Sequence, residues 1–378
     1  MDHSHRGRCQ FVCVLAHRYA IVQHCSRKTS REKDFRTMRP TSVFDTYWRF
    51  AAERHAMYMR RLAGKLAPLT DDPILTTYRF TNAYRAADRV SQFLITEVQY
   101  GPNRSQAPAE VFFRTILFKL FNRIETWRML EDTLGTISWQ ATSLDAVAEV
   151  LDAAFARGSR LYSAAYIMPA PRLGAIRKHA NHLTLLQSMM TDGLPGRIAS
   201  APSLADVFRL LVIYPGLGPF LAFQYTIDLN YSSLIDFAED SFVVAGPGAL
   251  DGIAKCFNEV GSRSAEDVIH WVVDNQEREF ERRGLDFGGL FGRRLQPIDC
   301  QNLFCEISKY ARVAHPEVKG VADRTRIKQR YRPATAPLPP PTFPPAWGLQ
   351  VPEQFSRTEP TCLLSLIEAA SPKFPVLA

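Results

Sequence analysis

The chain has 378 residues, of which 46% are hydrophobic and 22% charged, a composition typical of a globular protein with a substantial core. Its formal net charge of +8 favours an anionic partner such as nucleic acid. No apolar run reaches the 18 or more residues of a membrane span, so we expect no membrane partner. The seven cysteines, at positions 9, 13, 25, 256, 300, 305 and 362, show no disulfide framework, which favours a reducing cytoplasm.

Both ends of the chain differ from its middle. Residues 1–40 are basic and lack hydrophobic periodicity, so we expect a disordered extension, with Met38 as an alternative natural start. Its cluster of Cys9, Cys13, His17, His24 and Cys25 matches no familiar zinc module, and we expect neither a metal nor a cofactor. Residues 316–378 form a basic, proline-rich tail, and its segment Pro333–Pro345 is expected to be extended and solvated. Three interpretations of the tail stay open: it is free in solvent, docks onto the rest of the protein, or binds a proline-recognising partner.

Residues 41–315 show helical periodicity almost throughout, which predicts one all-α domain. The aromatic and small residues between Phe44 and Ala51 repeat at helical spacing. Ser143, Ser203 and Ser264 each stand where a helix N-cap is expected, the last two with an acidic residue three places on.

The most informative stretch runs from residue 203 to residue 257. An amphipathic helix ends at Tyr214-Pro-Gly-Leu-Gly-Pro219, and a second apolar helix is expected from Phe220 to about Leu229. Gly216 and Gly218 permit a tight turn and leave backbone N–H groups bare at the start of the second helix, where the helix dipole suits a phosphate oxygen. The Leu217 side chain is expected to be buried in the core and to anchor the turn. The same pattern is also compatible with a purely structural turn between two helices that binds no phosphate.

Asp240 lies 22 residues after Gly218, in a segment expected to open another helix. This arrangement of Gly216, Gly218 and Asp240 resembles the helix-hairpin-helix DNA glycosylase superfamily. The stretch Phe113–Trp127 resembles the helix that borders the base pocket of those enzymes. The resemblance implies an all-helical DNA-binding domain in which Asp240 faces a flipped nucleotide and Gly216, Leu217, Gly218 and Phe220 meet the DNA backbone.

The sequence also departs from that superfamily. Glycosylases that cleave the backbone carry a lysine where this chain has Phe220, so we expect no lyase activity. The four-cysteine iron–sulfur motif is missing, and Ser241-Phe242 replaces the usual Thr-His. The glycine-rich segment Gly246–Lys255 has the wrong register for a Walker A motif and is interpreted as a loop.

Two further stretches, Asp72–Val90 and Phe291–Arg312, narrow the resemblance. With the hairpin, they resemble the helical domain associated with 5-hydroxymethyluracil DNA kinases. They also resemble the related α-glutamyl/putrescinyl-thymine pyrophosphorylases, regarded as amino acid:DNA transferases of thymine hypermodification. Kinase activity in that family belongs to a separate P-loop domain, and no Walker A motif occurs in this chain, so we do not expect it to be a kinase by itself.

The polar residues of these stretches supply a candidate pocket. Arg79, Arg85 and Arg89 are expected close to one helical face, as a clamp for phosphate or base or as a solvated face paired with Asp88. Asn302, Glu306, Lys309 and Arg312 follow helical spacing, either as a buried bracing network or as substrate contacts. The full set of pocket candidates is Arg79, Asn82, Arg85, Asp88, Arg89, Lys119, Asn122, Asp299, Gln301, Asn302, Glu306, Lys309 and Arg312.

Three functions follow from these observations. The first is a transferase that displaces phosphate or pyrophosphate from a modified thymine, with DNA and an amino acid or amine as substrates. In it, Arg79, Arg85 and Lys119 form a cationic cradle and Asp240 orients or deprotonates the amine. The second is a monofunctional glycosylase, in which Asp240 stabilises an oxocarbenium-like sugar. The third is a non-catalytic DNA-reading subunit of a separate P-loop kinase.

Overall fold

The computed structural model describes residues 38–164, 168–334 and 336–355. It divides into the units Met1–Met38 and Arg39–Ala378, and every element below belongs to the second. The helices are α2 (Ser42–Leu62), α3 (Pro73–Thr77), α4 (Arg89–Phe93), α5 (Pro108–Phe121), α6 (Ile124–Leu134), α7 (Leu144–Ala156), α8 (Lys178–Thr191), α9 (Leu194–Ala199), α10 (Leu204–Val212), α11 (Pro219–Asn230), α12 (Pro247–Cys256), α13 (Ala265–Glu281) and α14 (Pro297–Ala314). The shorter elements are the strands β1 (Arg39–Pro40) and β2 (Phe257–Glu259), a π-helix, Leu94–Gln99, and single 3-10 turns at Arg85–Ala87, Glu239–Ser241, Pro345–Trp347 and Glu353–Phe355. The prediction of an all-α protein is therefore confirmed.

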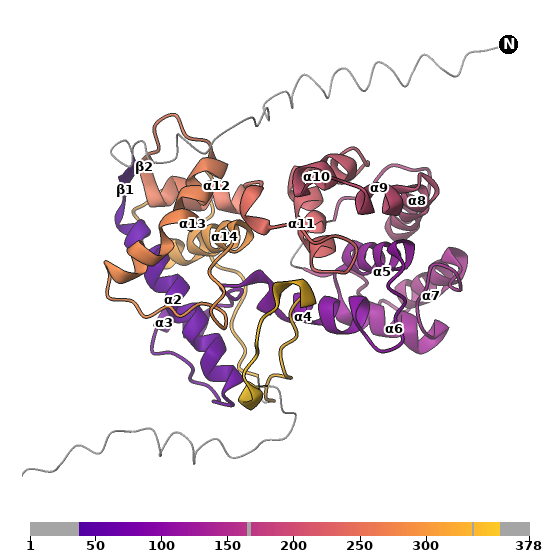
Figure 1. The fold of residues 1–378 in the computed structure, drawn as a ribbon, viewed down its shortest axis with the longest axis horizontal. Coiled ribbons are helices and arrows are strands. Elements are labelled where there is room, and N and C mark those ends of the chain that lie inside the picture. The colour runs from indigo at the N-terminus through magenta and orange to yellow at the C-terminus, as the bar shows by residue number, and fades with distance from the viewer. Residues whose placement is uncertain (1–37, 165–167, 335, 356–378) are drawn as a thin grey trace, which may run out of the picture. The chain divides into compact units, whose positions relative to one another are not determined.

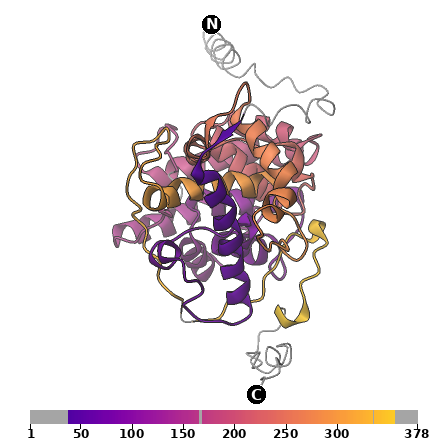
Figure 2. The ribbon, with the colours of Figure 1, turned by 90° about the vertical axis from the view of Figure 1, so that its left-hand side faces the viewer.

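Within the second unit, one group of helices packs around α14, which contacts α2, α12 and α13 (Figure 1). The longest described helix, α2, faces the viewer in Figure 2. Thr41 caps its start, and Phe44, Tyr47, Trp48 and Ala51 are buried, as their spacing predicted. Antiparallel pairing of β1 with β2 ties the beginning of this unit to the end of α12, so Arg39 and Pro40 are ordered, contrary to the expected disorder up to residue 40.

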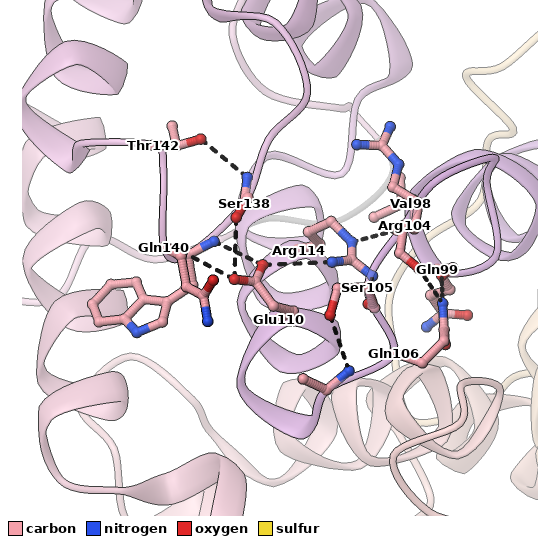
Figure 3. Close-up of polar contacts among 12 residues, drawn as sticks. Val98, Gln99, Arg104, Ser105, Gln106, Glu110, Arg114, Ser138, Gln140 and Thr142 are labelled. Atoms are coloured by element: carbon pink, nitrogen blue, oxygen red, sulfur yellow. Dashed lines mark hydrogen bonds and ion pairs between the residues drawn. The ribbon is translucent and has the colours of Figure 1, made fainter.

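The second group packs around α5, which contacts α8, α9, α11 and the π-helix (Figure 1). Glu110 and Arg114, two buried charged residues in the first half of α5, bind backbone groups of the segments around this helix (Figure 3). The Glu110 carboxylate accepts hydrogen bonds from the backbone N–H groups of Trp139 and Gln140, at 2.8 and 3.1 Å. Arg114 donates to the carbonyls of Val98 at 2.9 Å and Ser105 at 2.8 Å. Because these carbonyls lie at and beyond the π-helix, Arg114 holds that irregular segment against α5.

The three predicted serine caps are confirmed. Ser143, Ser203 and Ser264 precede α7, α10 and α13, and each side-chain oxygen accepts a backbone hydrogen bond from the first turn. Ser264 forms a full capping box with Asp267. Each cap depends only on a serine and the first turn of the helix that follows it, so it can be predicted from sequence without knowledge of the fold.

The interpretation of Gly246–Lys255 as a loop is wrong, because most of this segment is helix α12. Its glycines permit close packing on α14: a Cβ added at Gly252 would lie 2.0 Å from the carbonyl oxygen of Phe304, and one at Gly248 would lie 2.9 Å from Cys305 Sγ. These glycines therefore mark a helix contact rather than a flexible loop.

The expected helical face through Arg79, Arg85 and Arg89 is also wrong. Helix α3 ends at Thr77, Arg85 lies in a 3-10 turn, and α4 begins only at Arg89. Because no single helix contains the three arginines, they do not share one helical face.

The described part of the proline-rich segment has no helix or strand before Pro345, and it is not solvated throughout as predicted. Phe343 is buried, as are Pro341 and Pro344. Thr342 pairs with the Gln92 amide through two hydrogen bonds of 2.9 and 3.0 Å. The described part of the tail therefore docks onto the domain.

Candidate nucleic-acid interface and base site

The predicted hairpin is formed by α10 and α11. Leu217 is buried in the turn, as expected. Gly216 has a φ of +86°, which favours glycine, and the Leu217 N–H donates to the Tyr214 carbonyl at 3.1 Å. Gly218 is exposed at the start of α11, and no side chain caps it. The beginning of α11 thus has the features of a helix N-terminus that can receive an anion.

The segment that carries Asp240 is fixed to this hairpin. The Phe242 ring lies 5.3 Å from that of Phe208 on α10 and 5.8 Å from that of Phe223 on α11. Asn230 at the end of α11 exchanges two hydrogen bonds of 2.9 Å with the backbone of Phe237. The carboxylate-bearing turn is therefore positioned by the two helices of the hairpin.

Asp240 does not open a helix, contrary to expectation. It lies in a single 3-10 turn, and the next helix, α12, begins only at Pro247. Its side chain is exposed and makes no hydrogen bond or ion pair with any described residue. An exposed carboxylate of this kind is open to an external ligand.

Behind the hairpin, the structure brings Arg85 and Lys119 together on a carboxylate that sequence reasoning missed. Asp228 of α11 is fully buried; its Oδ1 lies 2.7 Å from Arg85 Nη2 and its Oδ2 3.2 Å from Lys119 Nζ. Lys119 also donates to Asn122 Oδ1 at 2.7 Å. Burial lowers the pKa of Lys119, and the neighbouring Asp228 carboxylate opposes this shift.

Arg85 extends this cluster to α14. Its Nε donates to Gln224 Oε1 at 3.0 Å, and its backbone N–H donates to Asp299 Oδ1 at 2.8 Å. Burial raises the pKa of Asp299 to about 6. Gln301 lies beside Gln224, with 3.5 Å between the two amides. Gln224 and Asp228, four residues apart in a mostly apolar helix, were the sequence signal for this cluster.

A second polar cluster joins α2 to α14. Arg54 donates to Asn82 Oδ1 at 2.6 Å, and Asp88 accepts from the Asn82 N–H at 2.8 Å. Desolvation raises the pKa of Asp88 to about 6. Glu306 pairs with Lys309 at 2.6 Å and accepts from the Thr81 N–H at 3.1 Å, the contacts of a bracing network.

The remaining pocket candidates lie apart from both clusters. Arg79 is exposed, and Arg89 is an exposed partner of Glu125 at 3.9 Å. Arg312 donates to the Arg326 carbonyl at 3.1 Å, and Asn302 is half-buried on α14. The structure thus places Arg85 and Lys119 in one cluster and leaves Arg79 outside it.

A third cluster surrounds Glu239, the buried neighbour of Asp240, which sequence reasoning also missed. Glu239 Oε1 lies 3.1 Å from Arg293 Nη2 and accepts from the Trp347 indole N–H at 3.0 Å. Burial raises the pKa of Glu239 to about 7, against the opposing charge of Arg293. A carboxyl group that titrates near neutrality is suited to proton transfer.

Two features are absent from the described residues. No group of three or more His, Cys, Asp or Glu side chains is placed there to hold a metal, and the cysteine–histidine cluster of residues 9–25 lies outside the described ranges. No helix in the described part of the chain is both long and apolar enough to cross a membrane.

Comparison with known proteins agrees with the resemblance seen in the sequence. A family model described as "5-hmdU DNA kinase, helical domain" matches residues 41–320. A curated relative, the 5-hmdU DNA kinase of Bacillus phage SP10, is 27% identical over 289 residues, which cover 71% of this chain and 45% of that protein. The chain therefore spans less than half of that relative's length, and no solved structure matches it significantly. Because the family model covers most of the chain, the protein belongs to the 5-hmdU DNA kinase helical domain family.

Proposed function

We propose that this protein binds DNA through the α10–α11 hairpin and acts on a flipped, modified thymine as a transferase of the thymine-hypermodification type. One observation carries the proposal: the uncapped start of α11 at Gly218 and the open carboxylate of Asp240 are held on the same hairpin by Phe242. The relative from phage SP10 is named for 5-hmdU in DNA, which supports the choice of base.

The reaction that fits these groups is a substitution at the 5-methylene carbon of the base. The amine of an amino acid or other amine forms a C–N bond to this carbon, while the C–O bond to a phosphate breaks and the phosphate leaves. Asp240 orients the amine and accepts its proton. Because the chain carries no Walker A motif, we assign any phosphorylation of the base to a separate P-loop kinase.

A second candidate is a DNA-reading subunit without catalysis of its own. It is favoured by the burial of Arg85 and Lys119, which already neutralise Asp228 and are therefore poorly placed to receive a leaving phosphate.

One experiment separates these functions. The purified chain is incubated with duplexes containing thymine, 5-hydroxymethyluracil or its phosphate ester, with and without amino acids, and the nucleosides are analysed by mass spectrometry. A transferase converts the phosphate ester to an amine adduct. Released free base indicates a glycosylase, and tightly bound but unchanged DNA indicates a reading subunit. Asp240→Asn is expected to abolish the reaction, whereas the exposed neighbour control Asp236→Asn is not.

The hairpin is tested separately by binding. Gly218→Asp places a negative charge at the start of α11, and we expect it to weaken duplex binding at least about tenfold, or about 1.4 kcal/mol. Gly218→Ala is the matched control, because a Cβ at this position meets nothing within 4 Å. Fluorescence anisotropy at a fixed salt concentration measures both variants. Equal affinities of Gly218→Asp and Gly218→Ala for the duplex would show that the hairpin does not contact DNA.

A further inference from the structure

The docked tail ends at an unusual contact with the domain. The Trp347 indole donates its N–H to Glu239 Oε1 at 3.0 Å. The Arg293 guanidinium carbon lies 3.8 Å from the centre of the Trp347 ring, and the Tyr231 ring meets it edge-on at 5.5 Å. A flat ring with one N–H is thus held by a carboxylate at its edge and a stacked cation on its face.

Glu239 and Arg293, which line a slot occupied by the Trp347 indole, keep unused hydrogen-bonding atoms. Glu239 Oε2 and Arg293 Nε are both buried, and neither has a hydrogen-bond partner among the described residues. The Glu239 side chain is only 3% exposed. Buried polar atoms without partners are rare in folded proteins and call for an explanation.

A uracil-type base supplies the missing partner. Such a base is flat and carries a ring N–H flanked by carbonyl oxygens. The N–H can donate to one oxygen of Glu239, as the indole N–H does. Because burial raises the pKa of Glu239 to about 7, its carboxyl is partly protonated near neutrality and can donate from the other oxygen to an adjacent base carbonyl. The second ring of the indole fills space that a 5-substituent of the base can occupy.

We propose that residues 343–347 form an internal plug and that Trp347 occupies the slot for a flipped, 5-substituted uracil-type base, bounded by Glu239, Arg293 and Tyr231. The proposal rests on the proposed action on DNA. It adds that the tail must leave before the base enters, so the tail competes with the substrate for one site.

The attachment of the plug suits a removable segment. Besides the contacts of Trp347 with Glu239 and Arg293, it is held by the Gln92–Thr342 amide pair and by ring contacts. Phe343 stacks on Trp347 at 6.0 Å and lies 6.1 Å from Phe291, and the Phe355 ring lies 5.8 Å from that of Phe291. Apart from the single 3-10 turn at Pro345–Trp347, its proline-rich backbone forms no helix or sheet pairing that would have to break. Adjacent Asp240 is exposed, which places the slot next to a surface that DNA can reach.

The test follows Trp347 directly in the full chain. The five tryptophans are labelled with 5-fluorotryptophan, and the Trp347 fluorine resonance is assigned with Trp347→Phe. Addition of a duplex with a mismatched, and therefore easily flipped, 5-hydroxymethyluracil is expected to move this resonance to a solvent-exposed position. The Trp139 resonance is the internal reference, because this ring packs on Phe113, away from the tail.

Binding measurements complete the test. Trp347→Ala is expected to tighten binding of the same duplex by at least about threefold, because the competing conformation is lost. The tail control Gln350→Ala is expected to leave affinity unchanged, and Glu239→Leu to weaken binding. If the duplex binds without moving the Trp347 resonance, and Trp347→Ala does not tighten binding, the plug is refuted while the hairpin interface stands. Displacement by a mismatched guanine but not by 5-hydroxymethyluracil overturns the choice of base. If neither wild type nor Trp347→Ala binds DNA, the proposed function fails together with the plug.

Discussion

Removal of the Asp228 carboxylate is expected to destabilise the protein strongly. Asp228 is fully buried and holds two cations, Arg85 at 2.7 Å and Lys119 at 3.2 Å, whose side chains are 3% and 6% exposed. In Asp228→Ala both cations keep the cost of burial but lose their shared counter-charge. Breaking a buried pair in this way costs about 3–5 kcal/mol, a large part of a typical stability of about 5–15 kcal/mol.

Urea unfolding at pH 7 measures this cost, and Glu277→Ala is the matched control. Glu277 also pairs with an arginine, Arg294, at 3.1 Å, but its side chain is 65% exposed, so its removal should cost less than about 1 kcal/mol. The deficit of Asp228→Ala should shrink as pH rises, because burial lowers the pKa of Lys119 and its neutral form tolerates the site better. Equal losses in Asp228→Ala and Glu277→Ala would show that the buried cluster contributes no more than a surface pair.

Three further predictions concern stability. Gly252→Ala should cost about 1–3 kcal/mol, because its Cβ would lie 2.0 Å from the Phe304 carbonyl oxygen and force α12 away from α14; calorimetry should show a lowered Tm, and an unchanged Tm would contradict the packing argument. Leu217→Ala should cost about 2–5 kcal/mol in urea unfolding, since Leu217 is buried in the hairpin turn, and a loss below 1 kcal/mol would mean that the turn is loosely packed. Glu239 ionises near its usual pKa when unfolded but keeps its proton to about pH 7 when folded, so the unfolded state binds fewer protons and stability falls as pH rises from about 4.5 to 7. Compared with Glu239→Gln, wild type should lose up to about 3 kcal/mol across that window, and parallel pH profiles of the two proteins would refute the raised pKa.

The elements that sequence predicted well depend on local signals. Ser143, Ser203 and Ser264 cap helices with donors from their own first turns, and the turn at Gly216 is set by a single positive φ. The apolar spacing in α2 and α11 likewise needs no knowledge of the partner helix. These features specify the all-helical fold and the hairpin.

The features that sequence missed depend on tertiary contacts. Gly252 looks like a loop residue until α14 lies against it. Asp228 and Glu239 look like ordinary acids until Arg85, Lys119, Arg293 and the distant Trp347 surround them. Sequence reasoning chose Asp240 by its spacing from the hairpin, and the structure shows that its neighbour Glu239 is the buried, pKa-shifted group.

The contacts of Arg85 also bear on the order of folding. This residue bonds to Gln224, 139 positions away, and to Asp299, 214 positions away. Contacts of such long sequence separation require closure of large loops, which slows their formation. We therefore expect the capped helices and the hairpin to form early and the Arg85 cluster to lock in late, so that substitutions at Asp228 should mainly accelerate unfolding and leave the refolding rate nearly unchanged.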